Sequence, residues 1–123
     1  MAKFYYCEKC SNLFGLLEDD KRPISCCGQQ MKLLEPKVTE EGGYEKHIPD
    51  VKVEGNSIKV QVGSTAHPMI PEHYISWIYL ETENGGQRKV CKVTPNAEFV
   101  LVNDKPIAVW AFCNLHGLWK KSL

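Results

Sequence analysis

Four cysteines near the start of the chain have the residue type and spacing of a metal site. The first pair forms the turn Cys7-Glu-Lys-Cys10, and the second pair is the adjacent Cys26-Cys27, followed by Gly28. A Cys-x-x-Cys turn lets two thiolates converge on one metal ion, and a second pair returned by a loop completes a tetrahedral sulfur site. Adjacent side chains on an extended backbone point apart, so both members of the second pair can bind only with a distorted backbone. The spacing leaves zinc, iron and a disulfide pair as alternatives, with zinc serving as a staple for a segment too small to fold unaided.

All four histidines and a fifth cysteine gather in the remainder of the chain. They occur in the segments Glu45-Lys46-His47, Ala66-His67-Pro68-Met69, Glu72-His73-Tyr74 and Cys113-Asn114-Leu115-His116. Each lies beside an expected strand end or loop, and Cys113 and His116 can bind one metal ion from a single turn. A lone histidine is more often a surface or core residue, but here four imidazoles and one thiolate are available together. This set exceeds the four ligands of structural zinc and suits a metal with five or six positions, such as iron.

A blue-copper site is the main competing interpretation of the histidine and cysteine pattern. Such a site also combines histidines with one cysteine in a β-sandwich, and Met69 could supply its weak axial methionine. However, no methionine follows His116, and two histidines would be left without a role. Cys91, within Lys-Val-Cys-Lys-Val, is predicted to be a small core thiol. The residues therefore leave three classes open: a redox enzyme, a copper or iron electron carrier without substrate turnover, and a zinc-stapled binding module.

Two different scaffolds are needed to position these residues. Residues 1–36 contain four cysteines, several turn formers and little aliphatic content, so they cannot build much of a core. After a polar connection near residue 37, short β-favouring runs alternate with turns at intervals of roughly 10 residues. The expected strands cover residues 51–54, 58–62, 74–81, 87–93, 97–102 and 107–113. We therefore expect an all-β protein whose second part is an antiparallel β-sandwich of six or seven strands and about 85 residues.

Length and composition limit the functions that are possible. The chain has 123 residues, 43% of them hydrophobic and 24% charged, which fits one main core with a small appendage. Lys and Arg total 15, as do Asp and Glu, so no global field attracts nucleic acid or an anionic membrane, and charge steering must be local. The longest apolar stretch, 107–113, is too short to cross a bilayer, and the first residues lack the apolar core of a signal peptide. We expect a soluble, cytoplasmic protein whose cysteines stay reduced.

Taken together, the motifs resemble the desulfoferrodoxins, a family of two-iron superoxide reductases. The matching segments are Cys-x-x-Cys with Cys-Cys-Gly-x-x-Met31, Glu-Lys-His47, His67-Pro-Met, Glu-x-His73-x-x-x-Trp77-Ile and Cys113-Asn-Leu-His-Gly-x-Trp119. They follow one another in the family's order over nearly the whole chain. The resemblance implies a desulforedoxin-like domain over residues 1–36, in which an FeS4 centre is held by Cys7, Cys10, Cys26 and Cys27. It also implies an immunoglobulin-like domain over residues 37–123 with a mononuclear iron. This iron has Cys113 as its axial ligand and is surrounded by a square of His47, His67, His73 and His116.

The resemblance further implies an activity and partners. The expected activity is one-electron reduction of superoxide to hydrogen peroxide at the ferrous His4Cys iron, without release of oxygen, in defence against oxidative stress. Lys46 and Glu45 resemble the family's mobile pair, in which the lysine attracts the anion and the glutamate takes the sixth iron position after oxidation. A rubredoxin-like protein is the implied electron donor, and a homodimer is the implied assembly. A cupredoxin-like or iron electron carrier without substrate turnover is the alternative function.

Overall fold

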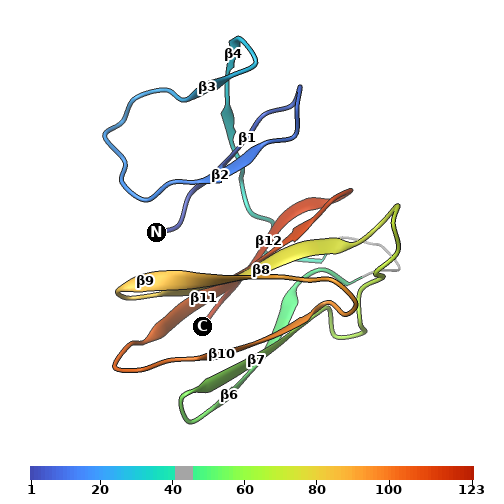
Figure 1. Ribbon diagram of the computed structural model, residues 1–123. Helices are drawn as coiled ribbons and strands as arrows, with labels where there is room; N and C mark the ends of the chain where they lie inside the picture. Colours follow the sequence, from blue (N-terminus) through green and yellow to red (C-terminus); the bar gives the residue numbers. More distant parts are fainter. Residues whose placement is uncertain (41–45) are drawn as a thin grey trace. The chain divides into compact units, whose positions relative to one another are not determined.

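The computed structural model of the chain describes residues 1–40 and 46–123. The chain divides into two compact units, Met1–Glu35 and Pro36–Leu123, called here the first and second units. All the regular secondary structure in the described residues consists of β-strands, which confirms the all-β fold class (Figure 1). No helix in these two ranges is long and apolar enough to cross a membrane.

The first unit consists of short strands joined by turns. Its strands are β1 (Phe4–Tyr6), β2 (Leu13–Gly15), β3 (Ser25–Cys26), β4 (Gln29–Gln30) and β5 (Lys32–Leu33). β1 lies between β2 and β5 in one antiparallel sheet, and β3 pairs with β4 in a separate hairpin. Among residues 1–35, all of which the structure describes, the buried apolar side chains are Phe4, Cys7 and Met31, whereas Leu17 is 99% exposed. This unit therefore has very little hydrophobic core.

The second unit is a two-layered antiparallel sandwich (Figure 1). Its strands are β6 (Pro49–Glu54), β7 (Ser57–Val62), β8 (Ile75–Thr82), β9 (Gly85–Val90), β10 (Asn96–Val100), β11 (Pro106–Cys113) and β12 (Gly117–Ser122). One sheet has the order β10-β7-β6 and the other has the order β12-β11-β8-β9. In an immunoglobulin constant-type domain the fourth strand joins the sheet of the first, second and fifth strands. Here the fourth strand, β9, pairs with β8 instead, so the sheet that contains β11 is the larger one.

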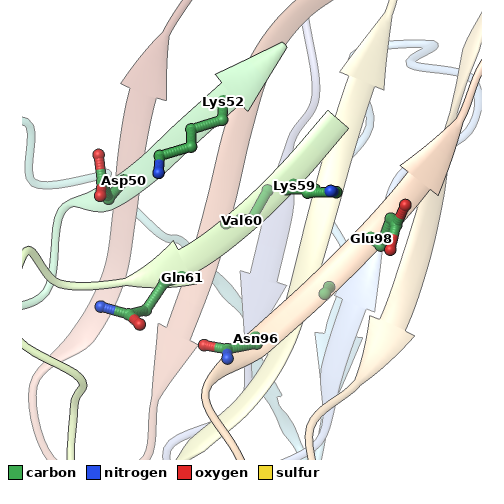
Figure 2. A pocket seen from close by; sticks show the side chains of 8 residues that line it. Asp50, Lys52, Lys59, Val60, Gln61, Asn96 and Glu98 are labelled. Atoms are coloured by element: carbon green, nitrogen blue, oxygen red, sulfur yellow. The ribbon is translucent and has the colours of Figure 1, made fainter. Parts of the chain in front are cut away.

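The core of the second unit lies between the two sheets. In β7, Ile58, Val60 and Val62 are buried while the side chains between them face outward, the alternation expected for a strand with one solvated face. Figure 2 shows Lys59 and Gln61 on this outer face, where they line a shallow surface hollow. The buried cluster between the sheets includes Ile58, Val60, Val62, Ile75, Ile78, Leu80, Phe99, Val109, Ala111 and Cys113.

Most of the expected strands form, with differences that have physical reasons. The hairpin of β6 and β7 is confirmed, with Gly55-Asn56 in its turn. The hairpin of β8 and β9 also forms, but Gly85 and Gly86 belong to β9 and not to the turn. Gly86 lies against the ring of Tyr79, which leaves no room for a Cβ atom. The sequence pattern does not predict β12, because its adjacent buried residues Leu118 and Trp119 break the alternation.

An irregularity occurs where β11 ends. Phe112 pairs with Trp77, but Cys113 pairs with Ile75, so the pairing skips Ser76 on β8. Such a bulge bends the strand and re-aims the side chains beside it, and bulges are common next to functional sites. Cys113 directly follows the bulge and is 0% exposed. The end of β11 therefore delivers a thiol to the interior of the sandwich.

Candidate metal centres

The four cysteines of the first unit meet at one point. Their Sγ atoms all lie within 4.8 Å of one another, and all four are free thiols. The Sγ atom of Cys26 is 3.5 Å from that of Cys10 and 3.9 Å from that of Cys27. Metal–sulfur bonds of about 2.3 Å in a tetrahedron place the sulfur atoms about 3.8 Å apart. The group of Cys7, Cys10, Cys26 and Cys27, called here the four-cysteine cluster, therefore fits one tetrahedral metal ion.

Two tight turns bring these cysteines together. The turn after β1 is closed by hydrogen bonds from Cys7 N to Asn12 O and from Ser11 N to Cys7 O, both 2.9 Å long. The turn between β3 and β4 consists of Cys27 and Gly28, whose φ angles are 53° and 75°. Two left-handed residues make a turn of type I′, and a non-glycine residue seldom adopts this conformation. The backbone distortion expected for the adjacent cysteine pair is thus present at Cys27.

The ionisation of the cluster also favours a bound cation. Backbone N–H groups, first that of Cys10 and then that of Lys9, lower the pKa of the Cys7 thiol to about 7. Interactions with the Cys10, Cys7 and Cys26 sulfur atoms raise the pKa of Cys27 to about 12. A metal ion binds thiolates and not thiols, so its positive charge would stabilise the ionised forms that the crowded sulfur atoms otherwise oppose.

The four histidine rings form a square at one end of the second unit. The centroid distances along its sides are 4.6 Å for His47–His67, 4.5 Å for His67–His73, 4.9 Å for His73–His116 and 4.8 Å for His116–His47. The diagonal from His47 to His73 is longer, at 6.2 Å. The Sγ atom of Cys113 lies 3.7 Å from His67 Nε2 and 3.7 Å from His116 Nδ1. These five side chains are called here the His4Cys cluster. Donor atoms of His47, His67, His73 and Cys113 all lie within 4.8 Å of one another, and His116 is close to this group through His47 and Cys113.

The inward-facing nitrogen atoms can be assigned for most of the square. His47 Nε2 is 3.1 Å from His116 Nδ1, so these two atoms face each other. His67 Nδ1 is 2.8 Å from the carbonyl oxygen of Pro68. Because a carbonyl only accepts hydrogen bonds, this contact requires the proton on Nδ1 and leaves a lone pair on Nε2. That lone pair faces the Cys113 sulfur, as a metal ligand in this cluster would require.

His73 has a buried ring nitrogen, Nε2, that lacks a hydrogen-bond partner among the described residues. Leaving a buried polar atom unsatisfied costs roughly 1–3 kcal/mol. A ring nitrogen of His73 lies within 4.8 Å of donor atoms of His47, His67 and Cys113, so the four side chains are close enough to share one metal ion.

All five residues lie where strands of the second unit begin or end. His47 precedes β6, His67 follows β7 and His73 precedes β8, while Cys113 ends β11 and His116 precedes β12. Antiparallel pairing places the start of β6 beside the end of β7, and the start of β8 beside the end of β11. The sheet topology therefore brings candidate ligands from separate loops to one end of the sandwich.

Contacts of His47 fix both its backbone and its ring. One carboxylate oxygen of Glu40 accepts hydrogen bonds from His47 N at 2.7 Å and from Ile48 N at 2.6 Å. The imidazole stacks on the ring of Trp119 at 4.4 Å with an interplanar angle of 10°. Burial, with a smaller contribution from the charge of neighbouring histidines, lowers the pKa of His47 to about 4. His47 is therefore neutral near pH 7, the state in which imidazole binds a metal.

A lysine also contacts the Trp119 ring. The Nζ atom of Lys37 lies 5.1 Å from the centre of the Trp119 ring and donates a 2.9 Å hydrogen bond to the carbonyl oxygen of His116. The backbone of Lys37 also pairs with that of β12 through Leu118 and Lys120. Neither Lys37 nor Glu40 stands out in the sequence, because both act through contacts with backbone groups and neighbouring rings and not through a motif.

The remaining predicted residues have varied positions. Lys46 is partly exposed, and its backbone packs against Gly63, whose φ of 85° and close contact with the Lys46 carbonyl leave no room for a side chain. Glu45 lies outside the described residues. Met69, the possible copper ligand, packs against the core with its Sδ atom 3.4 Å from Ile75 N. Cys91 is confirmed as a core thiol, and burial raises its pKa to about 11.

Known proteins resemble this chain in sequence and in structure. The family model described as Desulfoferrodoxin matches residues 39–122. A desulfoferrodoxin homolog of Archaeoglobus fulgidus is 43% identical over 122 residues, which cover 98% of this chain and 96% of that protein. The desulfoferrodoxin of Nitratidesulfovibrio vulgaris is 40% identical over 96% of this chain and 94% of its own length. The crystal structure of the superoxide reductase from Treponema pallidum aligns with a TM-score of 0.85 and 33% identity, covering 99% of this chain and 98% of that chain.

Proposed function

This chain belongs to the desulfoferrodoxin family, and we propose that it reduces superoxide to hydrogen peroxide at iron held by the His4Cys cluster. Desulfoferrodoxins carry two iron centres, and the chain offers a donor set for each of them. We assign the FeS4 centre to Cys7, Cys10, Cys26 and Cys27 in the first unit. We assign the mononuclear iron to His47, His67, His73, His116 and Cys113 in the second unit.

The observation that carries this proposal is the square of four imidazoles with a buried thiol beside it. Five donors leave one of six positions on an octahedral metal for a substrate. Cys113 is fully buried whereas His116 is exposed, so we place the thiolate on the inner side of the square and the substrate on the outer side. Ferrous iron in this cluster would supply the single electron that superoxide takes up and a position for the anion. The four-cysteine cluster offers no such position, because four thiolates complete its tetrahedron.

The reaction consumes one superoxide anion, one electron and two protons for each hydrogen peroxide. Substrate on the outer side of the square is close to solvent, which can deliver both protons without a buried relay. The inner side is occupied by Cys113 in the apolar cluster between the sheets, which keeps water from the thiolate. An external one-electron donor must restore the reduced state after each turnover, and we propose a rubredoxin-like protein for this role. A homodimer remains a prediction from the family resemblance.

Two charged residues before His47 are assigned roles as part of the proposal. Lys46 directly precedes a ligand in a chain of zero formal net charge, so its ammonium can attract the substrate anion locally. The backbone of Lys46 lies against Gly63, which directly follows β7. For Glu45 we retain the role implied by the resemblance, in which its carboxylate would be a ligand of the oxidised iron.

The proposed function is tested by rapid anaerobic mixing of the fully reduced protein with superoxide. We expect oxidation of one iron per superoxide, one hydrogen peroxide per electron transferred and no oxygen release. Oxygen production at half the superoxide consumed would indicate dismutation and contradict the proposal. Metal analysis of the same sample should give two irons per chain, whereas copper or zinc alone would favour a carrier or a structural module.

A matched pair of cysteine variants locates the reaction. Cys113 and Cys91 are both buried thiols of the second unit, but the Cys91 thiol is absent from both clusters. Cys113→Ala should abolish the fast reaction with superoxide, and Cys91→Ala should leave it unchanged. Equal rates in the two variants would show that the His4Cys cluster is not the site of reduction.

A further inference from the structure

Asn114 lies in the short turn between two proposed ligands, Cys113 and His116, yet its side chain contacts the loop that carries a third. Its Oδ1 atom accepts a 2.8 Å hydrogen bond from Tyr74 N, and its Nδ2 atom donates a 3.0 Å hydrogen bond to Glu72 O. These two backbone groups flank His73 on either side. We propose that Asn114 is a positioning residue that fixes His73 relative to Cys113 and His116.

The sheet by itself does not hold the His73 loop at this position. The pairing of β11 with β8 ends at Cys113 and Ile75, directly after the bulge at Ser76. Beyond that point the backbone of Asn114 continues the connection with one 3.2 Å hydrogen bond, from its N–H to Tyr74 O. The two side-chain hydrogen bonds of Asn114 then extend it past His73 to Glu72. The side chain of Asn114 thus takes the place of the backbone hydrogen bonds that are lost where β8 and β11 separate.

Apart from the bonds to Asn114, the backbone hydrogen bonds found for the His73 loop within the described residues are local to it. His73 and Ile70 exchange two backbone hydrogen bonds of 3.1 Å, which close the loop on itself but do not join it to β11. The Asn114 side chain is therefore a connection between this loop and the turn that carries Cys113 and His116. Metal affinity depends on donors held within about 0.5 Å of their bound positions.

The chemistry of the contact specifies an amide. The side chain must accept a hydrogen bond from Tyr74 N and at the same time donate one to Glu72 O. An ionised carboxylate cannot donate a hydrogen bond, and the side chain of serine is shorter than that of asparagine. Asn114→Asp preserves the size of the side chain and the bond to Tyr74 N, but it sets a carboxylate oxygen against Glu72 O. Asn114→Ala removes both hydrogen bonds. The two variants therefore grade the loss of the contact.

Asn84 provides a matched control at the other end of the same sandwich. Its N–H and its Nδ2 atom both contact Asp104 Oδ1, at 3.2 and 3.3 Å, and so join the turn between β8 and β9 to the loop between β10 and β11. This asparagine also ties two loops together but is remote from the His4Cys cluster, because it follows the opposite end of β8. Asn84→Ala should lower the thermal unfolding midpoint of the second unit without altering its metal site.

The test measures Co²⁺ binding to the full-length chain, because this inference rests on the proposed ligand set and not on the proposed reaction. Cobalt bound by four thiolates and cobalt bound by imidazoles and one thiolate have distinct visible spectra, so each cluster is followed separately. In competition with a chelator, Asn114→Ala should bind Co²⁺ at the His4Cys cluster about 10- to 100-fold more weakly than the parent, with shifted visible bands. The Co²⁺ affinity of Asn114→Asp should lie between those of Asn114→Ala and the parent. Asn84→Ala should match the parent in affinity and spectrum.

The outcomes separate this inference from the proposed function. Parent-like Co²⁺ affinity and spectrum in Asn114→Ala, with only a lowered unfolding midpoint, would make the residue structural and overturn the inference. If Asn114→Ala does not fold, the same measurements on Asn114→Asp decide, and a parent-like result there also overturns it. Failure of the parent to bind Co²⁺ at the His4Cys cluster would overturn the ligand set and the inference together. A protein that shows the expected cobalt behaviour but does not reduce superoxide would refute only the proposed reaction.

Discussion

The two clusters represent opposite relations between a metal site and its fold. In the four-cysteine cluster, Cys10 and Cys27 are exposed, and the surrounding unit buries few apolar side chains. In the His4Cys cluster, His47 is 5% exposed and His67 is 3% exposed, and both lie at the ends of strands that enclose a large apolar core. We therefore expect a bound metal to contribute much of the folding free energy of the first unit, and we expect the second unit to fold without metal and to offer a prepared site. Tight turns suffice for a staple, but an open reactive site needs a rigid support.

The largest effect is expected from removing the metal. A unit with three buried apolar side chains depends on its metal to fold, while the sandwich retains its core without one. Chelation under reducing conditions should therefore collapse the amide NMR resonances of residues 1–35 and leave those of the sandwich strands dispersed. Cys10→Ser should reproduce this result at full iron supply, and Cys91→Ser should not. Dispersed resonances from a metal-free first unit would contradict the contrast between the two regions.

The variant Lys46→Ala should have the next largest effect. Loss of its charge beside His47 should slow the bimolecular reaction of reduced protein with superoxide by roughly tenfold and flatten its dependence on ionic strength. Iron content should stay unchanged, since the lysine is not among the proposed ligands. Lys105→Ala is the control, because it removes an identical charge from the loop between β10 and β11. Equal rates and salt responses in the two variants would make Lys46 an ordinary surface residue.

A smaller effect is expected from Asp19 in the first unit. Its carboxylate accepts a 2.6 Å hydrogen bond from Lys3 Nζ and a 2.9 Å hydrogen bond from Lys21 N, and the Lys3 contact is the main cause that holds its pKa well below the usual range. A depressed pKa stabilises the fold above the unfolded pKa of about 4, and this contribution is lost as the pH falls below it.

The variant Asp19→Asn isolates this contribution. It should slightly lower the unfolding midpoint of the iron-loaded first unit at pH 7, and the difference from the parent should shrink below about pH 4. Asp20, with a side chain 72% exposed, gives the control variant Asp20→Asn, for which a still smaller change is expected. A difference that persisted unchanged into acid would exclude ionisation of Asp19 as its cause.

The smallest effect is expected from deleting the first unit altogether. A fragment of Pro36–Leu123 retains both sheets and the whole His4Cys cluster, so it should fold, bind one iron and react with superoxide within about twofold of the full chain. Stopped-flow kinetics with matched iron content would measure this. A folded, iron-loaded fragment that reacts slowly would mean that the four-cysteine cluster takes part in the capture of superoxide.

Strands with a clear alternation of buried and solvated residues could be predicted from the sequence, and others could not. β7 is an example of the first kind, since Ile58, Val60 and Val62 alternate with polar residues. β12 could not be predicted in this way, because its neighbouring residues Leu118 and Trp119 are both buried. The strands of the first unit have two or three residues each, too few for any periodicity to be visible.

The candidate ligands could be predicted from the sequence, but the residues that support them could not. Cysteine and histidine are rare residue types whose side chains have a distinctive chemistry, so spacing and motif suffice to select them. Asn114 and Glu40 act through hydrogen bonds to backbone groups, which lie in another loop for Asn114 and later in the same segment for Glu40. Their contribution depends on which backbone groups the fold brings within reach of these side chains, and no local sequence pattern predicts that.

The stack of His47 on Trp119 gives the second unit an intrinsic fluorescence probe. An indole 4.4 Å from an imidazole transfers excited-state electron density to it readily when the imidazole is protonated or bound to a cation. The emission of Trp119 is therefore tied to the occupancy of the neighbouring site. Trp77 and Trp110 lie on the central strands β8 and β11 and supply a background emission that does not depend on this stack. Loading and emptying of the His4Cys cluster can thus be followed by fluorescence lifetime in dilute solution, without an added dye.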